Sequence, residues 1–529
     1  MPIRPTFYGF EMARTAMSAS QKNIDITGQN IANINTLGYS RQRVSLSSVG
    51  AGGINWKYAL HPSELVGLGV NVDSIKRVRD QFLDTRFRTE LSENSRFAVK
   101  LDVLGYVESN IDEFIGDTGT LHSIVLSFQN ALNDLHMNNT SEAEFINMTR
   151  NAANQLVTTS RTIANRINII YDDTYEQLKF ITDEVNRIAQ ALEDINKEIR
   201  NQYLLGAVSN ELLDQRDLFL DQLSSYGNVT TRPAMIEKNG VLVDSGGVHV
   251  YFGILEGDWD AEDHGDWESS LLVSGTVKYH ANLEISGKGD QPVKLSWVND
   301  GMHVNGGNEF ILTAGEIFAC YEMLNGTGEI GMSADPETAD FASKGIPYFM
   351  NMINTFISEF AEVFNDLNVD MGDLFVANDG GADITAANIA ISDEWLTDPD
   401  FLLRTIDATG TQGAARNDNI LRMIHALKEP REFTDVNGTI YKGSFLEYLG
   451  SVNTEMALEV SYLNRRKDTS DINLLSIDMY RASIMDVDSD EEAMNLMKFQ
   501  KSYNAAIRFM TTLDEMLEMI INRMGIVGR

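Results

Sequence analysis

The residues that could do chemistry are few, and the best candidate for a metal site is an acidic stretch near the C-terminus. Asp486, Asp488 and Asp490 alternate there as the first ligands of a calcium loop do. Glu491 stands where that loop needs glycine, and Met497 where it needs glutamate, so the loop geometry is broken. Negative charge is also favoured at the start of a helix by the helix dipole. We therefore expect these carboxylates to begin a helix and not to hold a metal.

Histidine, glycine and cysteine give no better candidate. The eight histidines are scattered, and no two have the spacing of a zinc site. Gly67 and Gly69 begin a glycine-rich pattern that lacks its third glycine, so we expect no nucleotide site there. The acidic run at 258–268 is expected to be a solvated turn, and Cys320 a buried apolar residue. The sequence therefore predicts no catalytic residue, no cofactor and no metal site, and a protein that is not an enzyme.

The overall charge excludes two large classes of partner. The chain has 529 residues and a formal net charge of −35. Nucleic acids and anionic membranes are both bound through clustered Lys and Arg, so we expect neither partner. No apolar run is long enough to span a bilayer, and the start of the chain lacks the apolar core of a secretory signal. We therefore expect a protein that stays in the cytoplasm or leaves it by a route without a cleaved signal.

Both ends of the chain carry a helical seam. From Phe10 to Ile34, small and apolar residues recur at alternating spacings of three and four, which predicts one contact face on a long helix. Gly38 stands where a helix C-cap glycine would, and alternation from Arg41 to Leu46 predicts a strand after it. The seam residues are Phe10, Ala13, Met17, Ser20, Ile24, Thr27, Ile31 and Ile34.

The C-terminal seam is longer and almost wholly apolar. Ser489 with Glu492 predicts a capping box at the start of its helix, and Gly525 predicts the end. Such a stripe needs a partner, because packing holds most helices together. We therefore expect the two ends of the chain to pair as a coiled coil. The seam residues are Leu496, Phe499, Tyr503, Ala506, Met510, Leu513, Leu517, Ile520 and Met524.

The chain between these helices carries the excess of negative charge, and its hydrophobic period changes along the way. Helical spacing dominates residues 75–225, a period of two dominates 228–314, and helices resume afterwards. We predict a multidomain α+β protein with a coiled-coil inner domain (1–38 with 487–529), a mainly helical body (39–227 with 315–486) and an inserted β-rich outer domain (228–314). Within 370–445 only short mixed elements are expected.

The segment "NIANINTLGYSRQRV" resembles the N-terminal signature of the bacterial flagellar axial proteins, the family of rod, hook and hook-associated subunits. Matching residues are Asn30, Ile31, Ala32, Asn33, Thr36, Gly38 and Tyr39. The segments "GLGVNVDSIKRVRDQFLDTR" and "NELLDQRDLFLDQLS", and the last 40 residues, are similar to the hook-associated members at the hook–filament junction. Leu37 stands where many relatives have proline, and Asp486 where they have glycine.

This resemblance implies a structural component of the flagellum that forms the hook–filament junction through polymerisation of its terminal helices. It implies an inner coiled coil, a helical body outside it and an outermost β domain. The implied partners are copies of the chain in a ring, the hook protein on one side and the second hook-associated protein on the filament side. Secretion through the flagellar export apparatus is implied as well, with an export chaperone bound beforehand to the C-terminal helix.

Site residues are therefore expected on the two terminal helices and the turn that follows the first. On the N-terminal helix, assembly contacts are expected at Phe10, Ala13, Met17, Ile24, Ile31 and Ile34. On the C-terminal helix, assembly and chaperone contacts are expected at Leu496, Phe499, Tyr503, Met510, Leu513, Leu517 and Ile520. The family signature comprises Asn30, Ala32, Asn33, Thr36, Gly38 and Tyr39.

Three other functions stay open at this point. A hook- or rod-type subunit would share the N-terminal signature but would be expected to polymerise by itself into long tubes. An enzyme displayed on the flagellum through the β insertion has no motif in its favour. An adhesin or other surface-exposed domain in the same insertion is neither supported nor excluded by the residues.

Overall fold

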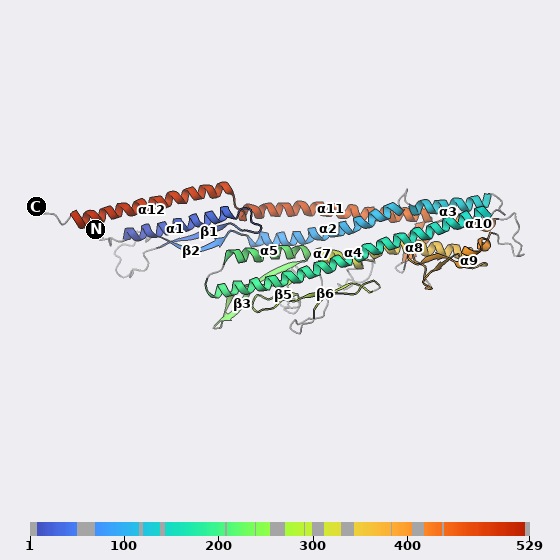
Figure 1. The fold of residues 1–529 in the computed structure, drawn as a ribbon, viewed down its shortest axis with the longest axis horizontal. Coiled ribbons are helices and arrows are strands. Elements are labelled where there is room, and N and C mark those ends of the chain that lie inside the picture. Colours follow the sequence, from blue (N-terminus) through green and yellow to red (C-terminus); the bar gives the residue numbers. More distant parts are fainter. Residues whose placement is uncertain are drawn as a thin grey trace.

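The structure is a computed structural model, and its described residues form one elongated molecule with long helices along its long axis (Figure 1). In that part of the chain, no helix is both long and apolar enough to cross a membrane. The described residues are 8–49, 69–115, 120–137, 143–206, 209–238, 240–253, 270–289, 291–298, 312–328, 343–381, 383–404, 417–435 and 438–523.

The two terminal helices lie side by side and antiparallel at one end of the molecule (Figure 1). They are α1 (Tyr8–Ala32) and α12 (Ser489–Arg523). The predicted pairing of the two chain ends is therefore confirmed. Strands β1 (Gln42–Ser48) and β2 (Val70–Arg77) form an antiparallel hairpin that packs against α1.

Helix α1 ends earlier than its seam predicted. It stops at Ala32, so Ile34 lies in the following turn with 41% of its surface exposed. The backbone N–H of Asn33 donates the last helical bond, to the carbonyl oxygen of Gln29 over 3.1 Å. The N–H groups of Ile34 and Thr36 instead bond to carbonyl oxygens three residues back, over 3.5 and 2.9 Å, so the chain leaves the α-helix in turns. The prediction that Gly38 caps this helix is wrong: with φ of +77°, it turns the chain toward β1 instead.

The start of α12 also differs from the prediction. Oδ1 of Asp488 accepts hydrogen bonds from the backbone N–H groups of Asp490 and Glu491, over 2.8 and 3.0 Å. Asp488 is therefore the N-cap, and the predicted capping box of Ser489 and Glu492 is wrong. Glu492 is buried instead and points toward α1.

The two departures from the family pattern are both accommodated. Asp486 has φ of −74° and ψ of 156°, an extended conformation that needs no glycine. Leu37 is 80% exposed in the turn after α1, so no core depends on it.

The body is built on long helices that continue from the terminal pair. The helical spacing predicted for 75–225 is confirmed along the middle of α4, where Leu178, Val185 and Leu192 share one face and are fully buried. Helix α11 packs along α2, which also contacts α4, α5 and α7. The helices are α2 (Gln81–Ile115), α3 (Thr120–Met137), α4 (Ala143–Leu204), α5 (Asn210–Tyr226), α7 (Glu316–Asn325), α8 (Ile346–Asp366), α10 (Asp418–Lys428) and α11 (Phe445–Met485).

The β insertion lies on one side of α4 (Figure 1). It contains a three-stranded antiparallel sheet in the order β3-β4-β5 and a separate β6-β7 hairpin. The alternation of apolar residues in 228–314 is not strand throughout, because residues 275–278 form bends and His280 makes a single bridge. The strands are β3 (Val229–Lys238), β4 (Val241–Phe252), β5 (Leu271–Val273), β6 (Leu283–Ser286) and β7 (Lys294–Trp297).

Buried asparagine side chains attach this insertion to the helices. In each of three pairs, the asparagine side-chain amide donates to the backbone carbonyl oxygen of one residue in or next to a strand and accepts from the N–H of the same residue. A neighbouring strand would make the same two hydrogen bonds. The six distances lie between 2.7 and 3.4 Å. This pairing satisfies backbone groups that would otherwise be buried without partners. The pairs are Asn186 with Leu283, Asn196 with Val248, and Asn325 with Val293.

The far end of the body contains an aromatic core around Phe360, whose ring centroid lies 4.6 Å from that of Phe364 and 5.5 Å from that of Phe375. Short elements cover it, as expected for 370–445. They are β8 (Phe375–Ala377), β9 (Ile389–Ile391), α9 (Asp393–Thr397), η4 (Pro399–Phe401), β10 (Arg431–Asp435) and β11 (Gly438–Gly443).

Several sequence expectations lie outside the described residues. They are the glycine at 67, the acidic turn at 258–268, the last seam position at 524 and the helix stop at 525. Cys320 is described, and it is buried as predicted.

Candidate functional site

Helices α1 and α12 pack closely along one line of contact, which is called the seam below. Ala13 and Ala506 are 1% and 8% exposed. A Cβ added at Gly9 would lie only 2.7 Å from Leu513, so the glycine permits the close approach at that level. Small residues on facing helices allow such backbone proximity, and the predicted seam positions lie along this line.

The predicted assembly residues fall into two groups in the structure. Most are partly buried where α1 and α12 pack together: Phe10, Met17, Ile24, Ile31, Leu496, Phe499, Tyr503, Met510, Leu513 and Leu517, with Ala13 fully buried. Ile34 and Ile520 are exposed, at 41% and 48%. The first group is thus partly covered within one chain, and the two exposed positions present most surface to another molecule.

A second face of α1 is covered by the β1–β2 hairpin. Gly69 has φ of +110°, and a Cβ there would lie 2.2 Å from Oγ1 of Thr15. Only glycine fits this position without moving α1, which gives a physical reason for a residue that the sequence marked by family resemblance alone.

Asn30 of the family signature joins three parts of the chain. Its amide nitrogen donates to the carbonyl oxygen of Gln42 over 3.0 Å and to Glu492 over 3.3 Å. Its Oδ1 accepts from the Tyr39 hydroxyl over 2.8 Å and from the backbone N–H of Gln42 over 3.0 Å. The amide thereby connects α1, the start of β1 and α12. Burial, with the negative charges of Asp214 and two glutamates, raises the pKa of Tyr39 to about 12, so its hydroxyl stays protonated as a donor.

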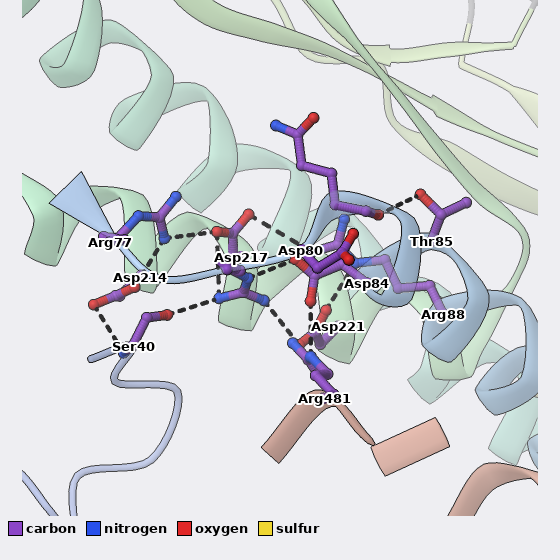
Figure 2. Close-up of polar contacts among 12 residues, drawn as sticks. Ser40, Arg77, Asp80, Asp84, Thr85, Arg88, Asp214, Asp217, Asp221 and Arg481 are labelled. Atoms are coloured by element: carbon purple, nitrogen blue, oxygen red, sulfur yellow. Dashed lines mark hydrogen bonds and ion pairs between the residues drawn. The ribbon is translucent and has the colours of Figure 1, made fainter. Parts of the chain in front are cut away.

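Below this turn lies a buried cluster of arginines and aspartates, shown in Figure 2 and called the joint below. It sits where the chain passes from β2 into α2 and where α11 ends, so both connections between the terminal helices and the body run past it. Its charged side chains are 7–15% exposed. The joint consists of Ser40, Arg77, Arg79, Asp84, Arg88, Asp214, Asp217, Asp221 and Arg481.

Three of the joint's aspartates come from one face of α5. Asp214, Asp217 and Asp221 are spaced three and four residues apart, which places their carboxylates on one side of a helix. Arg77 Nη1 lies 2.8 Å from both Asp214 and Asp217, and Arg88 Nε lies 2.7 Å from Asp221. Helix α5 thus receives cations from β2 and from α2.

The remaining arginines connect the joint to α2 and α11. Arg79 Nε lies 2.6 Å from Asp84, and its Nη1 lies 3.3 Å from the Ser40 hydroxyl oxygen. Arg481 Nε lies 2.7 Å from Asp84, and its Nη2 pairs with Asp221. Four arginines therefore meet four aspartates, and five segments of the chain are tied together.

The electrostatics of the joint favour the charged forms. Burial by itself would raise the pKa of Asp217, but Arg79, Arg77 and Arg88 outweigh it and hold that pKa at about 2. Burial likewise opposes the charge of Arg79, whose pKa is nevertheless raised by Asp217 and Asp84. Removing one partner from such a buried network costs about 3–5 kcal/mol, because the other charge is left buried and unpaired. The joint can fix the orientation of the terminal helices on the body, and it offers no group poised for catalysis.

Sequence reasoning found only part of this site. The family resemblance marked Arg77, Asp214 and Asp217, without a role for them. The aspartate spacing in "DQRDLFLD" was a usable signal for one charged helix face. Arg79, Arg88 and Arg481 gave no signal, because a single arginine on a helix or beside a strand usually lies in solvent.

Comparison with known proteins connects this architecture to a known class. A family model described as "Flagellar hook-associated protein FlgK helical domain" matches residues 109–382, about half of the chain. The models "Flagella basal body rod protein" and "Flagellar basal body rod FlgEFG protein C-terminal" match residues 10–39 and 483–524. The two rod-type matches fall on the terminal helices, and the hook-associated match falls on the body.

Individual relatives agree with these families. Flagellar hook-associated protein 1 of Bacillus subtilis (strain 168) is 29% identical over 539 residues, which cover 99% of both chains. The protein of that name from Salmonella typhimurium (strain LT2) is 26% identical over 231 residues, 41% of this chain and 38% of the relative. A solved structure, the flagellar hook junction protein FlgK from Burkholderia pseudomallei, aligns over 55% of this chain and 46% of its own with a TM-score of 0.41 and 14% identity, a likeness too distant to support the fold assignment.

The paired terminal helices, the helical body and these matches together define a structural protein of the extracellular flagellum, which assembles with other flagellar components and is not an enzyme. Within that class, the chain belongs to the family of flagellar hook-associated proteins whose helical domain the FlgK model describes.

Proposed function

We propose that this protein forms the junction between hook and filament, as a ring of copies held together through its terminal helices. The hook protein would contact the ring on one side, and the second hook-associated protein on the filament side. The observation that carries the proposal is the α1–α12 pair, which extends beyond the body as a rod with exposed apolar side chains (Figure 1).

These exposed side chains are the surface by which the rod would pack beside its neighbours. Six large apolar residues of α12 are 48–71% exposed, among them the predicted seam position Ile520. Exposed apolar side chains gathered on a helix that extends beyond the body are typical of interaction sites. The six residues are Met494 (60%), Met497 (54%), Met516 (55%), Met519 (50%), Ile520 (48%) and Ile521 (71%).

The same surface of α12 supports the proposal of an export chaperone. Before assembly, an exposed apolar helix face would promote aggregation, and a partner with a hydrophobic groove would cover it. Secretion would then follow through the flagellar export apparatus. A hook- or rod-type subunit that polymerises by itself is the competing proposal, supported by the rod-type matches at the two ends.

The experiment uses isolated hooks with open distal ends. The full chain is added, and in parallel a chain that lacks residues 1–35 and 489–529, and capped ends are counted by electron microscopy. A second test variant keeps both helices and replaces two exposed residues, Met497 and Ile521, by Gln.

Capping by the full chain alone is the expected result, with the double variant reduced severalfold. Long tubes that form without hooks would replace the junction assignment by that of a hook-type subunit. Equal capping by the full and the trimmed chains would show that the terminal helices are not the assembly element.

A further inference from the structure

The β3–β4 hairpin continues beyond the three-stranded sheet as an arm, defined here as residues 235–244. In this arm the two strands pair with each other, from Met235 opposite Asp244 to Lys238 opposite Val241, while β5 reaches only Val250 and Tyr251. A two-stranded ribbon without a third strand is marginally stable in water. The arm therefore gains stability from any surface that covers it.

Both faces of the arm carry exposed apolar side chains. Val241 and Leu242 are 62% and 69% exposed, and successive strand residues point to opposite faces. The end of α4 adds to this surface: Leu204 and Leu205 are 70% and 85% exposed. They lie beside the base of the arm, since a Cβ at Gly246 would lie 2.8 Å from the ring of the adjacent Tyr203.

A second exposed apolar surface, called the stripe below, runs along α11. Ile472, Leu475 and Met479 are 68%, 61% and 65% exposed and are spaced three and four residues apart, so they share one helix face. Ser470 and Arg481, which are buried against α2 and the joint, mark the opposite face. Tyr480, at 66% exposed, borders the stripe.

The positions of the arm and the stripe suit two copies of the chain side by side. The tip of β3–β4 and the end of α11 next to α12 lie at the same level along the long axis, on opposite sides of the molecule (Figure 1). A neighbouring copy shifted sideways would bring its arm onto the stripe. A contact between two different patches is heterologous, and it closes into a ring when the rotation from one copy to the next is a whole fraction of a turn.

Charge also favours a second copy as the occupant. The chain carries −35 overall, so most of its surface repels another copy. Apart from Arg481, which is buried in the joint, the segment of α11 from 458 to 485 has three basic and four acidic residues, and the arm has one basic and two acidic residues. Each patch thus carries a net charge of only −1 in a strongly acidic molecule, so two copies can meet there with little repulsion.

We propose that the arm of one copy docks on the α11 stripe of the next, as the lateral contact of the body outside the coiled-coil core. This inference rests on the proposed ring. It assigns to the β insertion a role in assembly, and it predicts that Leu242 of one copy lies against Leu475 of its neighbour.

The test is disulfide trapping between copies. A chain with Leu242→Cys is mixed with a chain with Leu475→Cys on isolated hooks under mild oxidation; the native Cys320 is fully buried. The mixture is expected to give at least tenfold more disulfide-linked dimer than either variant alone, because the contact joins two different patches. The control pairs Leu475→Cys with Phe180→Cys, an equally exposed position on α4 (70%) outside both patches.

A charge pair provides the second readout. Leu242→Glu is expected to reduce hook capping about tenfold, and adding Leu475→Lys in the same chain is expected to restore it, since each glutamate then meets a lysine of the next copy. Both positions are exposed, so the melting temperature should not change.

The outcomes separate this contact from the junction role. Capped hooks with no trapped dimer and no effect of Leu242→Glu would overturn the arm contact and leave the junction role standing. Trapped dimers without capping would support the arm contact and overturn the junction role. Trapping of the Phe180→Cys control as efficiently as the Leu242→Cys variant would overturn the arm contact.

Discussion

Arg481, four residues from the end of α11, donates from Nε to Oδ1 of Asp84 near the start of α2, over 2.7 Å. The two residues are 397 positions apart in the sequence. Their contact joins α2, which follows α1 and the β1–β2 hairpin in the chain, to α11, which leads into α12. The orientation of the rod on the body is thus held by buried charge in addition to apolar packing.

Replacing Arg481 by Leu is expected to destabilise the protein by about 3–5 kcal/mol, because Asp84 and Asp221 lose a buried counter-charge. Denaturant unfolding measures this loss. Arg465→Leu, at an exposed position on the same helix, is the matched control and should stay within about 0.5 kcal/mol of the parent. If the two variants are equally stable, the joint does not hold the body together.

Ala13→Glu is expected to separate the terminal helices, because Ala13 is 1% exposed in the seam and a carboxylate there would be buried without a partner. Amide hydrogen exchange should show protection of both α1 and α12 falling by more than tenfold. Ala32→Glu places the same side chain at an exposed position of α1 and should leave protection unchanged. Protection that survives Ala13→Glu would mean that the seam is not the principal contact.

Asn196→Ala is expected to loosen the β insertion. The N–H and C=O of Val248 would lose their side-chain partners, at a cost of about 1–3 kcal/mol. Limited proteolysis should then cut within β4 faster than in the parent protein. Asn154→Ala, on an exposed face of α4, is the control, and equal cleavage of both variants would rule out a docking role for the amide.

Glu316 gives a prediction about pH. Burial raises its pKa from 4.5 to about 7, so the folded state favours the protonated carboxyl. The stability that this group contributes is fully present below about pH 4.5 and is lost as the pH rises through about 7. Glu316→Gln should remove this dependence and stabilise the protein at pH 8 by roughly 1–3 kcal/mol.

Thermal unfolding between pH 5 and 8 measures the effect, with Glu176→Gln at an exposed position of α4 as the control. A melting temperature of the Glu316→Gln variant that falls with rising pH as steeply as that of the parent would contradict the assignment.

Much of the fold could be predicted because the spacing of apolar residues along the chain differs between a helix and a strand. The seams of α4 and α12 are long and regular, so their helices and the pairing of the chain ends followed from spacing. The end of α1 did not follow, because the chain turns after Ala32 and Ile34 bonds three residues back to Ile31, while the apolar spacing continues to Ile34.

The joint could not be predicted from the sequence, for a different reason. Its arginines and aspartates come from segments hundreds of residues apart, and no local pattern distinguishes Arg481 from a solvated arginine such as Arg465. Within the joint, only the three aspartates of α5, and Asp84 with Arg88 on α2, share a helix face by their spacing in the sequence. The burial of the cluster depends on α2, α5 and α11 meeting, which is a property of the tertiary structure.

Filament regrowth from isolated hooks is the most direct test of a role at the hook–filament junction. Hooks are incubated with the full chain, washed, and then supplied with the second hook-associated protein and flagellin, and filaments are counted by electron microscopy. Filaments are expected only on hooks that first received this chain, and few on hooks that received the chain lacking residues 1–35 and 489–529. Filaments of normal number on hooks that never received the chain would contradict a junction role.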